Sequence, residues 1–196
     1  MTYMLWPKKP MPLDFDIKKA IAAVAFLLQG QGKELDMFLG LKMLYLADKT
    51  ALIQWGKTIT GDSFVSMKKG PVLSRIYDLF RGTAKDKKSQ QEWDTFFSQR
   101  VSNGVRLLKS VDTGILSQRE METLEKARQE ILGCAPWEVA DWLHQTCPEW
   151  EDPKGSSRPI DPEVILRNAG RTDDDIQTIK ESNSTFVNTK EFLGIR

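Results

Sequence analysis

The feature that most constrains the fold is the stretch from Leu35 to Phe80, where a dense apolar run precedes two turn-rich segments and an amphipathic segment. The apolar run predicts a long, buried helix over residues 35–55. Two turns, Gly61-Asp62 and Gly70-Pro71, flank a β-prone segment and predict a tight hairpin. Proline is tolerated in the first turn of a helix, so Pro71 predicts the start of a second helix, which Gly82 ends. This pattern indicates a folding unit rather than an active site.

The same stretch carries an ordered set of short motifs. An apolar helix reading K-x-L-Y-x-A-D is followed by I-T-G-D-x-F, and then by K-x-G-P-V ahead of a helix that contains a tyrosine. In order and spacing these motifs resemble the Panacea domain, the SocA-like family found in bacteria and their phages. The resemblance covers residues 17–150, with weaker agreement at Leu143-His144 and Pro148-Glu149-Trp150. The matching residues are Lys42, Leu44, Tyr45, Ala47, Asp48, Gly56, Ile59, Thr60, Gly61, Asp62, Phe64, Lys68, Gly70, Pro71, Val72 and Tyr77.

Length and composition are typical of one folded domain with a C-terminal extension. The chain has 196 residues, of which 40% are hydrophobic. We expect a helix-rich α+β fold, a single compact helical domain with a small antiparallel β-sheet or hairpin and a C-terminal helical tail. The expected divisions are an N-terminal arm (1–15), the Panacea-like domain (16–150), a linker (151–160) and a helical extension (161–196).

Local signals predict the remaining elements. Asp16 predicts the start of a helix over residues 17–28, and Ser89-x-x-Glu92 and Ser117-x-x-Glu120 predict two further helices through capping boxes. Pro136 predicts another helix start. A β-prone segment over residues 103–108 could pair with the strand at Phe64. Helices are also expected from Asp161 and from Asp173, followed by a separate tail over residues 183–196 that either docks on the domain or is kept for a partner.

Asp48 is an acidic residue on the apolar face of the long helix, where its helical neighbours are Leu44, Tyr45, Ala51 and Leu52. Lys42 and Lys49 on the same helix are expected to reach water. A buried carboxylate must be hydrogen-bonded or paired. Asp48 could be a catalytic or metal-binding residue, but no catalytic partner lies near it in sequence. We favour a structural role in which it accepts hydrogen bonds from the following loops.

His144 is the only histidine of the chain. With Cys147 nearby it could act as a general base beside a nucleophile. Pro148 interrupts the helix just after it, however, and no third residue completes a catalytic arrangement. We therefore expect a packed, hydrogen-bonded histidine covered by Trp142 or Trp150. Two cysteines are too few for a zinc cluster or a disulfide framework, and no cofactor or metal is expected.

Charge is distributed unevenly along the chain. Residues 1–110 hold 18 Lys and Arg against 10 Asp and Glu, a formal charge of +8, whereas residues 111–196 carry −7. The basic part could bind nucleic acid and the acidic part a basic protein, or the two could attract each other in the fold. Lys68-Lys69 before Gly70-Pro71 could form an anion site, although no nucleotide-binding motif supports it. Nucleic acid is not expected as the main partner.

The resemblance implies an antitoxin of a type II toxin–antitoxin system, connected with phage defence, that neutralises a cognate toxin by direct protein–protein binding. The toxin would be encoded by the adjacent gene and held in a hetero-oligomer. An alternative is an adaptor that delivers the toxin to an ATP-dependent protease; a third is a nucleic-acid-binding regulator. No apolar run is long enough for a membrane span and no signal peptide is recognisable, so we expect a cytoplasmic protein. No nucleophile elbow, metal cluster, phosphate loop or carboxylate pair is recognisable either, so we expect it to be non-catalytic.

Two groups of residues follow from these expectations. The first should mainly support the fold and comprises the family-motif residues Lys42, Tyr45, Asp48, Gly61, Asp62, Lys68, Gly70, Pro71, Tyr77 and His144. The second should contact the partner, because it combines acidic and aromatic residues near the C-terminus. It comprises Asp173, Asp174, Asp175, Phe186 and Phe192.

Overall fold

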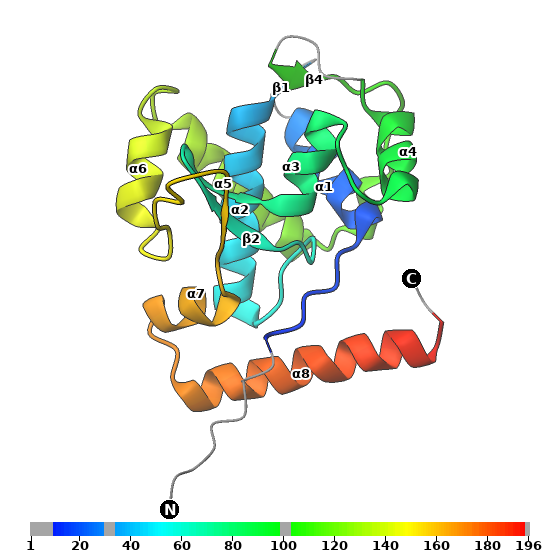
Figure 1. Ribbon diagram of the computed structural model, residues 1–196. Helices are drawn as coiled ribbons and strands as arrows, with labels where there is room; N and C mark the ends of the chain where they lie inside the picture. Colours follow the sequence, from blue (N-terminus) through cyan, green and yellow to red (C-terminus); the bar gives the residue numbers. More distant parts are fainter. Residues whose placement is uncertain (1–9, 30–33, 99–102, 195–196) are drawn as a thin grey trace, which may run out of the picture.

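The computed structural model describes residues 10–29, 34–98 and 103–194, which form eight α-helices, a 3-10 helix and two small antiparallel sheets (Figure 1). The predicted helix-rich α+β fold is therefore confirmed. In chain order the helices are α1 (Ile17–Gln29), α2 (Met37–Trp55), α3 (Ser74–Arg81), α4 (Lys87–Phe96), the 3-10 helix η1 (Thr113–Ile115), α5 (Gln118–Leu132), α6 (Val139–Thr146), α7 (Pro162–Asn168) and α8 (Asp173–Phe192).

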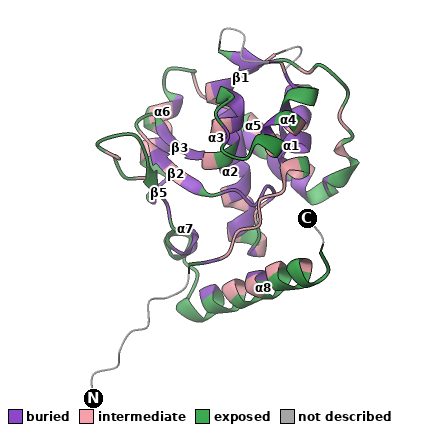
Figure 2. Ribbon diagram, turned by 45° about the vertical axis from the view of Figure 1, so that its right-hand side comes forward, coloured by how far each residue is buried: buried purple, intermediate pink, exposed green. Residues whose placement is uncertain are grey.

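Helix α2 is the centre of the domain. It contacts α1, α3, α5, α7 and the strand β3 (Gly70–Leu73), and all of its residues from Gly40 to Asp48 are buried (Figure 2). Asp36 caps its start by accepting a hydrogen bond from the backbone N–H of Leu39 at 2.9 Å, and Gly56 ends it in the left-handed conformation. Because residues 40–48 are buried on every side of the helix, other elements have to cover it all round, and this requirement arranges them around it.

The three-stranded sheet consists of β2 (Phe64–Met67), β3 (Gly70–Leu73) and β5 (Arg158–Pro159), in the order β3-β2-β5. The predicted hairpin is present, with Phe64 opposite Leu73 and Met67 opposite Gly70. The second sheet pairs β1 (Leu35–Asp36) with β4 (Gly104–Val105). The expected pairing of the 103–108 segment with the strand at Phe64 is therefore wrong, because the 103–108 segment instead pairs with the residues just before α2.

Three predicted helix starts need correction. Pro71 does not open a helix: it lies in β3, an edge strand, where a missing N–H is tolerated, and α3 begins only at Ser74. Asp86, rather than Ser89, caps α4, accepting the N–H of Lys88 at 3.0 Å. Residues 136–138 form a turn, and α6 begins at Val139. The Asp16 cap and the Ser117–Glu120 capping box are both confirmed.

The C-terminal region combines a short strand with a long helix. Residues 158–159 form β5, whose pairing with β2 ties the segment to the sheet. Residues 183–192 belong to α8, a single helix of 20 residues that runs below the rest of the domain in Figure 1. Thr172 and Asp175 form a capping box at its start.

Gly61 provides a stability test of the contact between the N-terminal segment and the loop after α2. Its φ is +71°, and a Cβ there would lie 1.8 Å from the carbonyl oxygen of Asp14. We expect Gly61→Ala to lower the free energy of unfolding by about 3–5 kcal/mol, since strain and overpacking add. Gly82 is a matched control with a φ of +70° and open space around it. Gly82→Ala should cost about 1–2 kcal/mol. If urea denaturation gave equal losses of unfolding free energy for the two variants, the predicted clash with Asp14 would be contradicted.

Candidate partner-binding surface

Two buried carboxylates hold the loop that follows α2. Asp48 accepts hydrogen bonds from the N–H groups of Ile59 and Thr60 at 2.9 and 3.1 Å, and from the Thr60 hydroxyl at 2.5 Å. Asp62 accepts from the N–H groups of Ser63, Arg75 and Ile76, and so caps the start of α3. These contacts are the structural role expected for Asp48. Burial raises the pKa of Asp48 to about 7 and that of Asp62 to about 6, against the opposing effect of the hydrogen bonds.

A second polar cluster joins α2 to the segment after α6. Glu149 is buried, accepts a short hydrogen bond from the Tyr45 hydroxyl, and pairs with Lys49 at 2.7 Å. Burial raises the pKa of Tyr45 well above its usual value, and the neighbouring Cys147 and Glu149 add to this. Burial also raises the pKa of the Cys147 thiol, which makes it a poor nucleophile. The cluster therefore links α2 to the segment after α6 through a hydrogen bond and an ion pair.

Lys42 was expected to reach water but is only 1% exposed. Its Nζ donates to the carbonyl oxygen of Pro71 at 2.9 Å, and no carboxylate of the described residues forms an ion pair with it. Burial lowers the pKa of Lys42 to about 7. The expectation is wrong because β3 covers the side of α2 on which Lys42 lies.

His144 is half-buried and stacks on Trp150 with the ring centroids 3.7 Å apart, as expected. Its Nε2 is buried and has no hydrogen-bond partner among the described residues. The expected hydrogen bond is thus not formed at this nitrogen. Trp150 itself donates to the carbonyl oxygen of Met67 at 2.9 Å, which links the end of α6 to β2.

Of the other motif residues, Gly70 and Pro71 are buried in β3, whereas Lys68 is exposed at the hairpin turn. Tyr77 is half-buried and accepts a hydrogen bond from Arg81 at 2.9 Å. The motif residues are therefore mostly interior, and they leave the domain surface to residues outside the motif.

Helix α8 docks on the C-terminal end of α2 through a few specific contacts. The Asn183 side-chain amide donates to the carbonyl oxygen of Gly56 at 3.0 Å, and Arg171 donates to that of Ile53 at 2.7 Å. Ile176 is buried. Farther along α8, Lys190 pairs at 2.5 Å with Asp14 of the N-terminal segment. The helix is thus fixed at both of its ends, and the surface between these contacts remains accessible.

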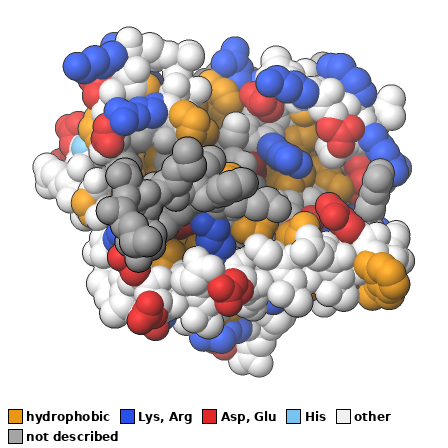
Figure 3. All heavy atoms as spheres, turned by 60° about the horizontal axis from the view of Figure 1, so that its bottom comes forward, with side chains coloured by type: hydrophobic (Ala, Val, Ile, Leu, Met, Phe, Trp, Pro, Cys, Tyr) orange, Lys and Arg blue, Asp and Glu red, His pale blue; other side chains and the backbone are white. Residues whose placement is uncertain are grey.

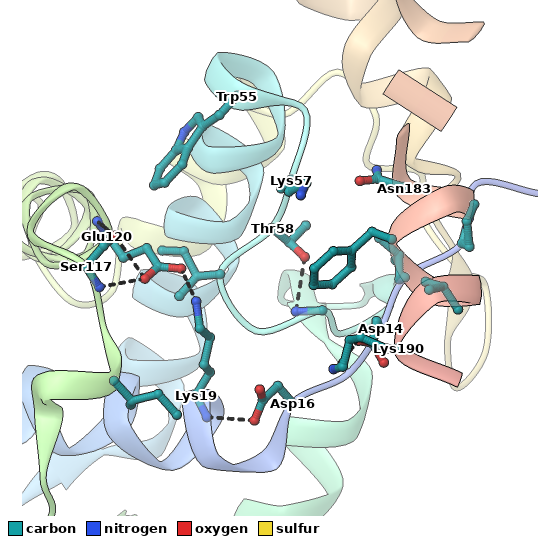
Figure 4. A pocket seen from close by; sticks show the side chains of 17 residues that line it. Asp14, Asp16, Lys19, Trp55, Lys57, Thr58, Ser117, Glu120, Asn183 and Lys190 are labelled. Carbon is teal, nitrogen blue, oxygen red and sulfur yellow. Dashed lines mark hydrogen bonds and ion pairs between the residues drawn. The ribbon is translucent and has the colours of Figure 1, made fainter. Parts of the chain in front are cut away.

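A cleft with a volume of about 410 Å³ opens between α8 and the end of α2 (Figure 4). Lys57 lies 4.4 Å from the ring centroid of Phe186, and Lys19 pairs with Glu120 at 2.5 Å. Figure 3 shows this face of the domain, with hydrophobic and basic side chains gathered in the hollow above α8. The Nε1 of Trp55, which lines the cleft, has no hydrogen-bond partner among the described residues. The cleft therefore combines apolar, basic and hydrogen-bonding groups.

The predicted partner-contacting residues all lie on α8, but they fall into two separate groups. Asp173, Asp174 and Asp175 are exposed in its first turn, where Asp173 pairs with Arg167 and Asp175 takes part in the capping box. Phe186, 46% exposed, lines the cleft, and Phe192, 90% exposed, lies at the far end of the helix. No structural finding tests their role in binding, which stays a prediction.

The sequence analysis missed several residues of this surface. Trp55 and Lys57, at the end of α2, were not singled out, and neither were Asp14, Asn183 and Lys190. The Trp-Gly-Lys sequence at the helix end was the available signal, since an aromatic residue and a cation flank the glycine that ends the helix. Their meeting with α8 depends on tertiary packing.

Comparison with known proteins identifies the family to which the chain belongs. The chain belongs to the family of SocA-like antitoxins with a Panacea domain, because the family model "Antitoxin SocA-like, Panacea domain" matches residues 41–151, more than half of its 196 residues. Comparisons with curated proteins and with solved structures gave no match. Helix α8 and the N-terminal segment that lines the cleft lie outside the matched residues.

No helix among the described residues is long and apolar enough to cross a membrane. Likewise, residues 10–29, 34–98 and 103–194 contain no group of three or more His, Cys, Asp or Glu side chains placed to hold a metal ion.

The buried Lys42 gives a pH test. Its pKa of about 7 in the folded chain lies below the 10.5 of an exposed lysine. Between these values the unfolded chain binds more protons at this site, so its contribution to stability rises with pH. We expect the free energy of unfolding, measured in urea from pH 7 to 9, to rise less in Lys42→Met than in the wild type. Lys85→Met, an exposed control, should keep the wild-type slope; equal slopes for all three proteins would contradict the prediction.

Proposed function

We propose that this protein is the antitoxin of a type II toxin–antitoxin system and neutralises a protein toxin by direct binding, without catalysis. Membership of the SocA-like antitoxin family suggests a protein partner such as a toxin. One observation supports neutralisation by direct binding in particular: α8, which lies outside the family-matched residues, presents acidic and aromatic side chains to solvent. Exposed aromatic side chains are typical of protein–protein contacts, and acidic side chains complement a basic partner surface.

The motif residues support this division of roles. Asp48 and Asp62 direct their carboxylate oxygens to backbone N–H groups inside the domain. A buried side chain that is engaged in this way contributes to stability and is not accessible to a partner. Recognition of a particular toxin therefore falls to exposed residues, and the α8 surface with its cleft is the best-equipped region.

The chemistry of α8 defines the partner that would fit. An acidic first turn attracts a basic surface, and the exposed rings of Phe186 and Phe192 fill apolar pockets on a partner. A toxin that acts on RNA needs such a basic surface, and covering it would block substrate access. Asp174 is the best placed of the three aspartates for this contact, because Asp173 and Asp175 have partners within the domain.

Co-expression with the product of the adjacent reading frame tests the proposed function. We expect growth to be rescued, the toxin level to stay unchanged, and the two proteins to co-purify. Rescue with falling toxin levels and no complex would instead indicate a protease adaptor. A harmless neighbour that does not co-purify would contradict the proposal, as would rescue that requires promoter binding.

Single substitutions on α8 locate the surface. We expect Phe192→Ala to weaken toxin binding about tenfold or more in isothermal titration calorimetry, since exposed aromatic anchors carry much of the binding energy. Trp137→Ala is a matched control, because Trp137 is 79% exposed but lies before α6. For charge, Asp174→Lys should weaken binding and reduce its salt dependence, whereas Glu130→Lys on α5 should not. If the control variants lost toxin binding and the α8 variants kept it, the interface would lie elsewhere on the domain.

A further inference from the structure

A second cavity lies at the other end of α2 from the cleft. It has a volume of about 450 Å³ and lies between the start of α2, the β2–β3 hairpin and α3. This size falls within the range of roughly 300–1,000 Å³ typical of small-molecule sites. None of the α8 residues lines it. The cavity is therefore separate from the proposed toxin-binding surface, and its role can be tested independently.

The lining of this cavity is strongly basic. Lys42, Lys68, Lys69 and Arg81 all line it, against one acidic residue, Asp36. The Asp36 carboxylate is engaged by the backbone at the start of α2, where it accepts the N–H of Leu39. Like charges gathered around one cavity repel one another and attract a multivalent anion.

Lys42 distinguishes the cavity from an ordinary solvated patch of lysines. Its ammonium group is buried at Gly70, where a Cβ would lie 3.3 Å from Nζ, and among the described residues it has one hydrogen bond, to the carbonyl oxygen of Pro71. An ammonium group has three donors. Burial without a carboxylate partner is costly, as the lowered pKa of Lys42 indicates, and a bound anion would offset that cost.

Apart from Asn103 and Ser156, the remaining walls are apolar and aromatic. Met37, Phe38, Leu41, Met67 and Val72 line the cavity together with Tyr77, whose hydroxyl accepts a hydrogen bond from Arg81. Phe38 also lies 5.4 Å below the Lys42 ammonium group. Such walls would hold an organic group attached to the anion, since apolar surface favours burial of apolar surface.

We propose that this cavity binds a small organic phosphate monoester, with the phosphate group near Lys42 and Arg81 and the organic group against Phe38, Met67 and Tyr77. A phosphate dianion balances several cations, which a single carboxylate does not, and arginine matches its geometry with two parallel N–H donors. The Gly70 position contributes by leaving room beside the Lys42 ammonium group.

Isothermal titration calorimetry of the full chain with phenyl phosphate tests the proposal, with phenol and inorganic phosphate as partial ligands. We expect saturable 1:1 binding of phenyl phosphate, at least tenfold weaker binding of inorganic phosphate and none of phenol. Lys42→Met and the exposed Arg81→Gln should each weaken phenyl phosphate binding about tenfold or more. Lys85→Met, a lysine on the loop after α3 that does not line the cavity, should bind as the wild type does.

Several results would contradict phosphate monoester binding in this cavity. Absence of saturable phenyl phosphate binding would overturn the proposal, and so would wild-type affinity in both Lys42→Met and Arg81→Gln. Inorganic phosphate binding as tightly as phenyl phosphate would indicate an adventitious ion only. Arg81 is exposed, so its variant remains informative even if Lys42→Met fails to fold. Failure of this site would leave the proposed toxin binding unaffected, because α8 takes no part in it.

Discussion

Much of this structure depends on how the chain accommodates two buried carboxylates just after its central helix. Asp48 and Asp62 lie within the core, and each accepts three hydrogen bonds from the loop or helix start beside it. Thr60 connects the two systems: its hydroxyl donates to Asp48 and accepts the N–H of Asp62. Its carbonyl oxygen in turn accepts the N–H of Asp16 at the start of α1. One short loop thereby sets the relative positions of α1, α2 and α3.

The central helix also carries cations and a phenol into the interior, and these groups receive different compensation. Lys49 and Tyr45 both contact Glu149, so their burial is balanced by a charge and by hydrogen bonds. Within the described part of the chain, Lys42 donates a single hydrogen bond, to a carbonyl oxygen. A stable interior tends to pair its charges, and the contrast between Lys42 and Lys49 on the same helix is what directs attention to the basic cavity.

Sequence reasoning succeeded where the deciding contact is local. The Asp16 cap, the Ser117–Glu120 capping box and the β2–β3 hairpin each depend on residues only a few positions apart. It failed where distant segments compete. The 103–108 segment has the composition of a strand, but nothing in it reveals that Leu35 is its partner. Lys42 resembles a solvated lysine because the strand that covers it comes about 30 residues later.

The same limit applies to the candidate surface. Phe186 and the aspartates of α8 could be proposed from the sequence alone, because they lie on a polar background near the C-terminus. The cleft that Phe186 shares with Trp55 and Lys57, however, forms only when α8 packs against the end of α2. Single residues of a surface can thus be anticipated, whereas their grouping depends on packing that acts over more than a hundred residues of chain.

The ion pair between Asp14 and Lys190 has a practical consequence for anyone who joins this domain to another protein. It brings the two ends of the domain together on the side where the cleft opens. A fluorescent protein or affinity handle attached before Asp14 or after Lys190 would therefore begin beside the proposed binding surface. Insertion at an exposed loop that does not line the cleft, such as residues 154–155, would leave that surface clear.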